Sequence, residues 1–443
     1  MHEAVTEALR IAIAKAGAIF QPLVSHLYEP HLTYTKSQGG WHGEYQPRPS
    51  ASRIVGHSFE AQDEAGTELT DALRRHHPEL AGMVGIAGCG QFNLLLDRSY
   101  ILRGIMIELF RRHGTFQPST VATEAIIEEF AEFVDCERVR VRYTAPLLNY
   151  TMTTEKLSLS NGVCIRRLSE DEINKVYGVS VWQLGMVSSF RRGMMIDEYV
   201  AEGEFELAKV YGDSPSGVSV QGNVRSNLDS LITALRTFKD GRVGYDSVQL
   251  QSVKFSPLIL GTWGFGDLHI PFGQYELTDA DTEPLLAHAE LIAACTEPIM
   301  KMACSRLADA QVRLRPQDQL IDAVIGLEAL LLAGMQKEDR RGELRFRFSL
   351  NYAMLADRPE KRDLAFRVAR DLYDHRSAIA HGGEPGEPCR IGDDTLSLGE
   401  TANRAMEELR RVIRRFLPVA SSAPYKRDQF WKDAYFGVSG EGS

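Results

Sequence analysis

Apolar residues recur at helical spacing through the C-terminal part of the chain, from about residue 278 to 418. The segment 316–332 is apolar nearly all round, which predicts the buried central helix of a bundle. Pro316 suits the first turn of that helix, because a missing N–H group costs nothing there. Further helices are predicted at 283–310 (as one helix or two), 343–356, 360–380 and 400–417. The tail, residues 419–443, is polar with exposed aromatic residues and predicts irregular structure.

The pattern of residues 1–135 predicts a mostly helical region. Helical spacing is found at 2–20, 64–76, 97–112 and 119–134. The stretch from about Tyr34 to Gln62 is polar and rich in glycine and proline, and so predicts a loop. A second glycine-rich stretch, around 82–90, matches neither the phosphate-loop nor the dinucleotide spacing, and we interpret it as a loop or a tight helix contact.

Between residues 136 and 277 the spacing changes from helical to alternating. Val139, Val141 and Tyr143 alternate with arginines, as in a strand with one buried face. The remaining elements predicted here are two short strands around an Asn-Gly turn at 157–165, a strand at 205–211 and a helix at 224–238. We therefore expect an α+β multidomain protein. Its expected parts are a mostly helical N-terminal region (1–135), a small central α/β domain (136–277), an all-α C-terminal bundle (278–418) and a tail.

Composition narrows the class of protein. Of the 443 residues, 25% are charged and 44% apolar, as in an ordinary globular protein. No apolar run approaches the length of a membrane span and no signal peptide is evident, so we expect a cytoplasmic protein with no membrane partner. The six cysteines are scattered without a C-x-x-C pair, which favours reduced thiols over a zinc site. The net charge of −10 argues against non-specific coating of nucleic acid, but a local basic cleft is compatible with it.

The most distinctive stretch runs from Leu372 to Gly383. Within it Arg376 and His381 are separated by four residues near the end of a predicted helix, and two glycines follow. This stretch resembles the signature of the Apea-like HEPN domain family of the HEPN superfamily, an arginine followed after four to six residues by a histidine. Segments 319–331 and 343–348 resemble the family's first two core helices, and 235–241 resembles a stretch that precedes such domains. Many family nucleases have Asn, Asp or His after the arginine, where this chain has Ser377.

The resemblance implies a helical bundle that acts as a metal-independent RNA endonuclease with no cofactor, often an anti-phage defence effector or a toxin. It gives the catalytic roles to Arg376 and His381. It also implies a homodimer through the C-terminal bundle, in which paired motifs form one composite cleft.

An arginine and a histidine suit RNA cleavage through the 2′-OH group. A histidine near its ordinary pKa takes or gives a proton at neutral pH. An arginine holds phosphate oxygens with two parallel hydrogen bonds and stabilises charge that grows in the transition state. The product would carry a 2′,3′-cyclic phosphate, and DNA, which lacks the 2′-OH, would be spared.

Helix geometry complicates this assignment. On a straight helix Arg376 and His381 lie about 140° apart, so they do not share a face. Either the helix ends before His381 and the glycines swing it round, or the site is assembled between two chains. The side of the helix that carries His381 also carries three candidate supporting residues, Arg370, Asp374 and Ser377.

Two further features allow more than one interpretation. Arg370 and His375 repeat the same spacing, but His375 falls on the apolar stripe of the helix, which favours a core histidine. The last helix carries several arginines, which form either a solvated face or a basic wall for RNA. For the second interpretation Arg411 and Arg415, together with Arg347, are the candidate RNA-binding residues.

Two functions remain as hypotheses. The first is a HEPN-type RNA endonuclease whose N-terminal part senses a phage component or a partner protein. The alternative is a non-catalytic HEPN module that binds RNA, a nucleotide or a partner protein. Labelled RNA incubated with the protein and EDTA distinguishes them, because only the enzyme cuts.

Overall fold

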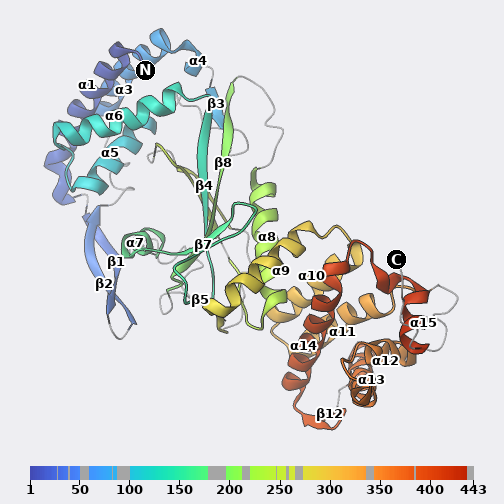
Figure 1. Ribbon diagram of the computed structural model, residues 1–443. Coiled ribbons are helices and arrows are strands. Elements are labelled where there is room, and N and C mark those ends of the chain that lie inside the picture. The colour runs from blue at the N-terminus through green and yellow to red at the C-terminus, as the bar shows by residue number, and fades with distance from the viewer. Residues whose placement is uncertain are drawn as a thin grey trace. The chain divides into compact units, whose positions relative to one another are not determined.

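The computed structural model describes residues 1–26, 28–37, 40–49, 59–81, 83–86, 100–177, 196–211, 220–245, 247–255, 259–264, 273–335, 344–383 and 386–436. Within these residues the chain has an α+β fold of helices and small sheets (Figure 1). It divides into two compact units. The N-terminal unit comprises Met1–Leu147, Glu155–Ser226 and Tyr245–Leu268, and the C-terminal unit comprises Leu148–Thr154, Asn227–Gly244 and His269–Ser443.

The helices predicted in the N-terminal region are confirmed. They are α1 (Glu3–Phe20), α3 (Phe59–His76), α5 (Tyr100–His113) and α6 (Thr120–Asp135), with the short α4 (Pro78–Ala81). Helix α1 contacts the other three long helices. Val5, Leu9 and Ile13 recur every four residues on α1 and are buried, as expected of an amphipathic core helix.

The segment that contains helix α1 contradicts the expectation that the chain has no apolar run of membrane-spanning length. Residues 3–25 are long and apolar enough to cross a membrane by length and composition alone. The expectation that no apolar run approaches that length is therefore wrong for this segment. In the structure 33% of that apolar stretch is buried, and the buried side of α1 packs on neighbouring helices.

An antiparallel hairpin occupies much of the stretch predicted to be a loop. Its strands are β1 (Tyr28–Ser37) and β2 (Gly40–Pro49). Tyr34 anchors it, packing on Leu168, Ile173 and Val200. The side chain of Asn174 accepts from the Tyr34 N–H at 2.7 Å and donates to its carbonyl at 2.9 Å. The buried face is narrow and the strands contain several glycines and prolines, so no clear alternation marked it in the sequence.

The sheet of the N-terminal unit has the strand order β10-β9-β4-β8-β7-β6, with β3 also paired to β8. Its strands are β3 (Met83–Ile86), β4 (Arg138–Pro146), β6 (Lys156–Ser158), β7 (Cys164–Arg167), β8 (Tyr199–Tyr211), β9 (Ser247–Ser252) and β10 (Ile259–Gly264), and α7 (Glu170–Tyr177) follows β7. All pairings are antiparallel. The alternation on β4 is confirmed: Val139 and Val141 are buried, while Arg140 and Arg142 are paired with Glu204 on β8.

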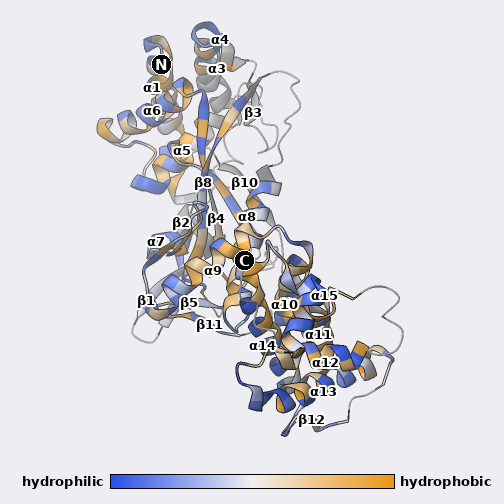
Figure 2. Ribbon diagram, turned by 45° about the vertical axis from the view of Figure 1, so that its right-hand side comes forward, coloured by the Kyte–Doolittle hydropathy of each residue, from blue (hydrophilic) through white to orange (hydrophobic). Residues whose placement is uncertain are grey.

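The C-terminal unit is a helical bundle around α11. Its helices are the later part of α8 (Val220–Phe238), α9 (Thr282–Ala294), α10 (Pro298–Val312), α11 (Pro316–Leu331), α12 (Leu344–Met354), α13 (Arg362–Ala380), α14 (Leu398–Phe416) and α15 (Asp428–Phe436). Helix α11 contacts α10, α12, α13 and α14, which confirms the predicted central helix. The helices carry both hydrophobic and hydrophilic residues along their length (Figure 2). Buried hydrophobic residues of α10, α11, α12, α13, α14 and α15 form one core.

Two small sheets accompany the helices, so the unit is not strictly all-α. The hairpin β12 (Cys389–Ile391) and β13 (Asp394–Leu396) precedes α14. The strand β5 (Tyr150–Met152) pairs in parallel with β11 (Tyr275–Leu277). Segment 283–310 forms two helices, α9 and α10, of which Pro298 opens the second.

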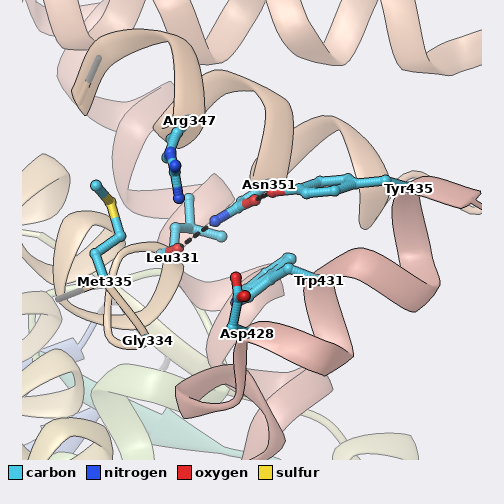
Figure 3. A pocket seen from close by; sticks show the side chains of 8 residues that line it. All are labelled: Leu331, Gly334, Met335, Arg347, Asn351, Asp428, Trp431 and Tyr435. Atoms are coloured by element: carbon cyan, nitrogen blue, oxygen red, sulfur yellow. Dashed lines mark hydrogen bonds between the residues drawn. The ribbon is translucent and has the colours of Figure 1, made fainter. Parts of the chain in front are cut away.

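The tail contains a helix where irregular structure was predicted. Trp431 on α15 is 4% exposed, and Tyr425 just before it is fully buried. Both rings pack against Phe416 at the end of α14. Helix α15 also lines a small cavity beside α12 (Figure 3). Only a few residues of this segment, such as Tyr425 and Trp431, are buried, and the residues between them are mostly polar. The segment therefore has no regular apolar pattern from which a packed helix could be predicted.

The stretch 235–241 belongs to the C-terminal unit, and its side chains hold that unit together. Arg236 donates to the Val243 carbonyl, Thr237 contacts His288, Lys239 pairs with Asp281 and Asp240 pairs with Arg410. Gly241 has φ +135° and lies so close to Gln274 that a side chain would not fit. The division of the chain therefore differs from the sequence boundaries at 135, 277 and 418.

Candidate active site on helix α13

Helix α13 stays regular until it reaches His381. It ends at Ala380, and the His381 N–H still donates to the Ser377 carbonyl at 3.1 Å. Gly382 takes the left-handed conformation, φ +79°, that closes many helices. The N–H of Gly383 then donates to the Ala378 carbonyl at 2.8 Å. The turn thus follows His381, so the glycines do not swing this histidine toward Arg376.

Arg376 is partly buried and already has a partner. Its Nη2 donates to Oε2 of Glu328 on α11 at 3.2 Å, and its side chain is 24% exposed. The Nε atom is buried and, within the described residues, has no hydrogen-bond partner. Burial raises the pKa of the Glu328 carboxyl, and the nearby charge of Arg376 partly opposes that shift.

His381 is exposed. Within the part of the chain that the structure describes, its side chain makes no hydrogen bond or ion pair, to Arg376 or to any other residue. One chain therefore presents the two predicted catalytic residues separately, with the arginine against α11 and the histidine in solvent.

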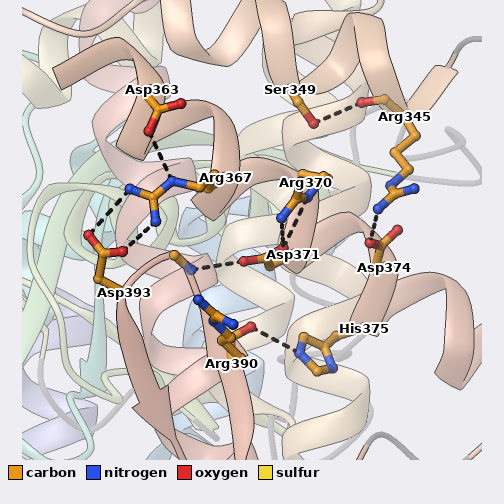
Figure 4. A network of polar contacts seen from close by, with 11 residues as sticks. Arg345, Ser349, Asp363, Arg367, Arg370, Asp371, Asp374, His375, Arg390 and Asp393 are labelled. Atoms are coloured by element: carbon orange, nitrogen blue, oxygen red, sulfur yellow. Dashed lines mark hydrogen bonds and ion pairs between the residues drawn. The ribbon is translucent and has the colours of Figure 1, made fainter. Parts of the chain in front are cut away.

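The predicted supporting residues are held by other partners (Figure 4). Asp374 is paired with Arg345 of α12. Arg370 donates to Asp371 at 3.2 Å, and the other oxygen of Asp371 accepts from the Gly392 N–H at 2.9 Å. Ser377 is half-buried and its carbonyl caps His381. These contacts place Arg370 and Asp374 in the framework around α13.

His375 is not the core histidine that its place on the apolar stripe predicted. It is half-buried, and its Nε2 lies 3.4 Å from the Arg390 carbonyl oxygen of β12 (Figure 4). The stripe is fully buried only in its middle, at Val368 and Leu372. The hairpin β12–β13 contributes a carbonyl rather than an apolar side chain beside the histidine, so a polar side chain is satisfied there.

The arginines of α14 do not form one basic face. Arg411 donates to Glu408 at 3.0 Å and lies 5.0 Å from the centre of the Tyr352 ring. Glu408 is buried and also accepts from Tyr352 and Arg404. Arg415, by contrast, is exposed, and the nearest carboxylate, on Asp357, lies 3.9 Å away. Arg411 is therefore a structural residue, whereas Arg415 is accessible to a phosphate backbone.

Arg410 has a role that sequence reasoning did not assign. Its side chain is only 1% exposed, and it pairs with Glu407 and, at 3.4 Å, with Asp240. Its position offered a signal, since it follows Met406 by one helical turn on the buried side of α14. The third predicted RNA-binding residue, Arg347, is partly buried and lines the cavity beside α15 (Figure 3).

Comparison of the chain with protein-family models, with curated proteins and with solved structures found no match. Within the described residues, no group of three or more His, Cys, Asp or Glu side chains is placed to hold a metal ion.

Proposed function

We propose that the chain is a metal-independent RNA endonuclease of HEPN type, acting in the cytoplasm as an anti-phage or toxin effector. The observation that supports the proposal most directly is the environment of the Arg376 side chain. Its guanidinium is oriented by Glu328 through Nη2, and its side chain remains 24% exposed. A phosphate oxygen is the acceptor that arginine binds best.

The proposed reaction assigns one step to each residue. The Nε2 or Nδ1 atom of a neutral His381 takes the 2′-OH proton as the 2′ oxygen attacks the adjacent phosphorus. The bond from phosphorus to the 5′ oxygen breaks, and a protonated histidine gives the leaving 5′ oxygen its proton. Arg376 stabilises the charge that grows on the phosphate. The products are a 2′,3′-cyclic phosphate and a 5′-OH.

The separation of Arg376 from His381 supports a site built from two copies of the chain. A twofold axis beside α13 brings each helix next to its copy, so one copy supplies a histidine where the other supplies an arginine. An exposed apolar patch on the adjacent helices suits such contact. Phe346 on α12 is 54% exposed and its ring centre lies 5.8 Å from that of Phe366 on α13, with Leu364 also exposed.

Uniformly labelled RNA incubated with the protein in excess EDTA tests the proposal. We expect cleavage to continue, with 2′,3′-cyclic phosphate ends, and to stop at a position where the 2′-OH is replaced by hydrogen. His381→Ala is the matched inactive variant, because the exposed side chain it removes makes no hydrogen bond or ion pair within the described residues. Cleavage only on addition of a divalent metal, or equal cleavage of the deoxy-substituted RNA, would contradict the mechanism.

One observation favours the alternative, a module that binds RNA or another partner without cutting. Arg376 is engaged by Glu328 in its own chain, and such a pair can be a structural ion pair alone. A gel shift of the same labelled RNA without any cleavage, unchanged in His381→Ala, would support this function instead.

A further inference from the structure

A small cavity between α12 and α15 presents opposite charges to a space the size of one ring system. Its volume is about 170 Å³, and it is partly open to solvent. Ligand sites for drug-sized molecules run to about 300–1,000 Å³, whereas a cavity of about 150 Å³ holds benzene. Arg347 approaches from α12 and Asp428 from the first turn of α15, while Trp431 and Tyr435 form the walls (Figure 3).

Most polar groups around this cavity are already satisfied. Asn351 donates to the Leu331 carbonyl at 2.6 Å and accepts from the Tyr435 hydroxyl. The indole N–H of Trp431 donates to the Tyr425 carbonyl at 3.0 Å. These bonds fix the walls, so the cavity is built before anything enters it.

Arg347 and Asp428 are the polar groups that remain available. Within the described residues Arg347 makes no hydrogen bond or ion pair. Asp428 pairs through Oδ2 with Lys432, at 2.7 Å, on the solvent side, and its other oxygen makes no hydrogen bond or ion pair among the described residues. The guanidinium and the carboxylate enter the cavity from opposite walls (Figure 3).

This pair of charges selects the chemistry of the occupant. Arg347 attracts an anion that Asp428 repels, and Asp428 attracts a cation that Arg347 repels, so the pair favours neither kind of ion. A neutral planar group with acceptors on one edge and donors on another satisfies both charges and packs against the aromatic walls.

We propose that this cavity binds a guanine base. Guanine offers the acceptors O6 and N7 on one edge, which arginine reads with two hydrogen bonds. Its N1–H and N2–H₂ groups are donors on another edge, where a carboxylate accepts them. Adenine places a donor beside N7, and so opposes the arginine. As a base of RNA, guanine would set the position of the cut, and this part rests on the proposed function; binding of the free nucleoside does not.

The first experiment titrates the full chain with guanosine, adenosine, GMP and inorganic phosphate, each followed by calorimetry. We expect guanosine and GMP to bind with similar affinity and adenosine at least tenfold more weakly, since a good bidentate contact discriminates by about 1–3 kcal/mol. Equal binding of guanosine and adenosine, or no binding of guanosine at millimolar concentration, would overturn the proposal. Phosphate that binds and displaces GMP would show an anion site at Arg347 instead.

Two variants separate the contacts. Asp428→Asn keeps the size of an exposed side chain but replaces an acceptor oxygen with a donor, and should weaken guanosine binding about tenfold or more. Arg347→Lys keeps the charge but loses the planar fork, and should also weaken it. Lys432→Gln, which removes only the solvent-side partner of Asp428, is the control and should bind guanosine as the parent does. Unchanged binding in Asp428→Asn would refute the assignment.

The second experiment maps cleavage ends on RNA of random sequence. We expect guanine to be enriched at one position relative to the cut, and the enrichment to disappear in Asp428→Asn while cutting continues. Cutting without any base preference in the parent would place the guanine site outside the substrate path. Guanosine binding without RNA cleavage would leave the cavity assigned and reject the nuclease, so the two failures are distinguishable.

Discussion

Arg376 on α13 and Glu328 on α11 form an ion pair across 3.2 Å, so the arginine of the Arg–His motif is linked to the central helix of its bundle. The carboxylate fixes the guanidinium through Nη2 and leaves Nε without a partner among the described residues. Because burial raises the pKa of Glu328, removing the arginine affects folding as well as any chemistry.

Arg376→Ala should lower the free energy of unfolding by about 1–3 kcal/mol at neutral pH, since it leaves a largely buried carboxylate unpaired. The loss should grow as pH rises above the unfolded pKa of Glu328, because the folded state then favours the protonated form even more. The double variant Arg376→Ala, Glu328→Gln should recover stability but not cleavage. Urea unfolding at pH 5 and pH 8 measures both effects, and additive losses in the double variant would contradict the coupling.

His381→Ala should leave the melting temperature unchanged, because the exposed side chain makes no hydrogen bond or ion pair within the described residues. RNA cleavage should fall to background. His375→Ala is the comparison: it removes the contact with the Arg390 carbonyl and should lower the melting temperature, with cleavage retained in the folded fraction. An inert, fully folded His375→Ala beside an active His381→Ala would exchange the two roles.

The two glycines with positive φ should respond differently to alanine. At Gly382 (φ +79°) an added Cβ meets nothing within 4 Å, so Gly382→Ala should cost only the backbone term of about 1–2 kcal/mol. At Gly241 (φ +135°) the Cβ would lie 2.8 Å from the Gln274 carbonyl oxygen, and the cost should reach about 3 kcal/mol or more. Chemical unfolding of both variants measures the difference, and equal losses would contradict the close approach at Gly241.

Stability should fall as pH drops from 6.5 toward 4 because of His288. Burial, with the nearby charge of Arg414, lowers the pKa of His288 to about 4 from an ordinary 6.5. The folded state therefore favours the neutral ring. The stability that His288 contributes is fully present above pH 6.5 and is lost as the pH falls toward 4. A loss of roughly 2–3 kcal/mol is expected. His288→Gln retains a donor for the Thr237 hydroxyl, 2.7 Å from the histidine nitrogen, without titrating. Its unfolding free energy should vary less over this range; an identical slope would reject His288 as the cause.

Alanine variants of Arg411 and Arg415 should differ in their effects, one on the stability of the fold and the other on RNA binding. Arg411→Ala should destabilise the fold, because it removes a partner of the buried Glu408. Arg415→Ala should leave stability unchanged and reduce the salt dependence of RNA binding by the contribution of one phosphate contact. Melting curves and binding measured at several salt concentrations test the pair, and a reversed pattern would contradict the assignment.

Helical segments could be predicted from the sequence wherever burial covers a whole face. The apolar run of α11 and the alternation on β4 are examples, because a single period holds over many residues. The sequence pattern does not predict the hairpin β1–β2 or helix α15, since each is fixed by a few long-range anchors such as Tyr34 and Trp431. Such contacts leave no periodic signal.

The residues of the candidate site could be identified from the sequence motif, but their partners and relative positions could not. The spacing identifies Arg376 and His381, yet the partner of the arginine, Glu328, lies 48 residues earlier on another helix. The same limit applies to Arg410, which pairs with Asp240, 170 residues away. Pairings of this kind follow from the fold, which a local pattern does not encode.

The interleaving of the two units has a consequence for synthesis of the chain. Domains usually fold one after another as they leave the ribosome. Here the N-terminal unit includes 245–268, while the C-terminal unit uses 148–154 and 227–244, made well before its bundle. Asp240 cannot form its ion pair until Arg410 on α14 has been synthesised, and β5 cannot pair until β11 has been synthesised. A nascent chain of this protein therefore lacks the finished bundle, and with it the proposed cleavage of RNA, until α14 has emerged.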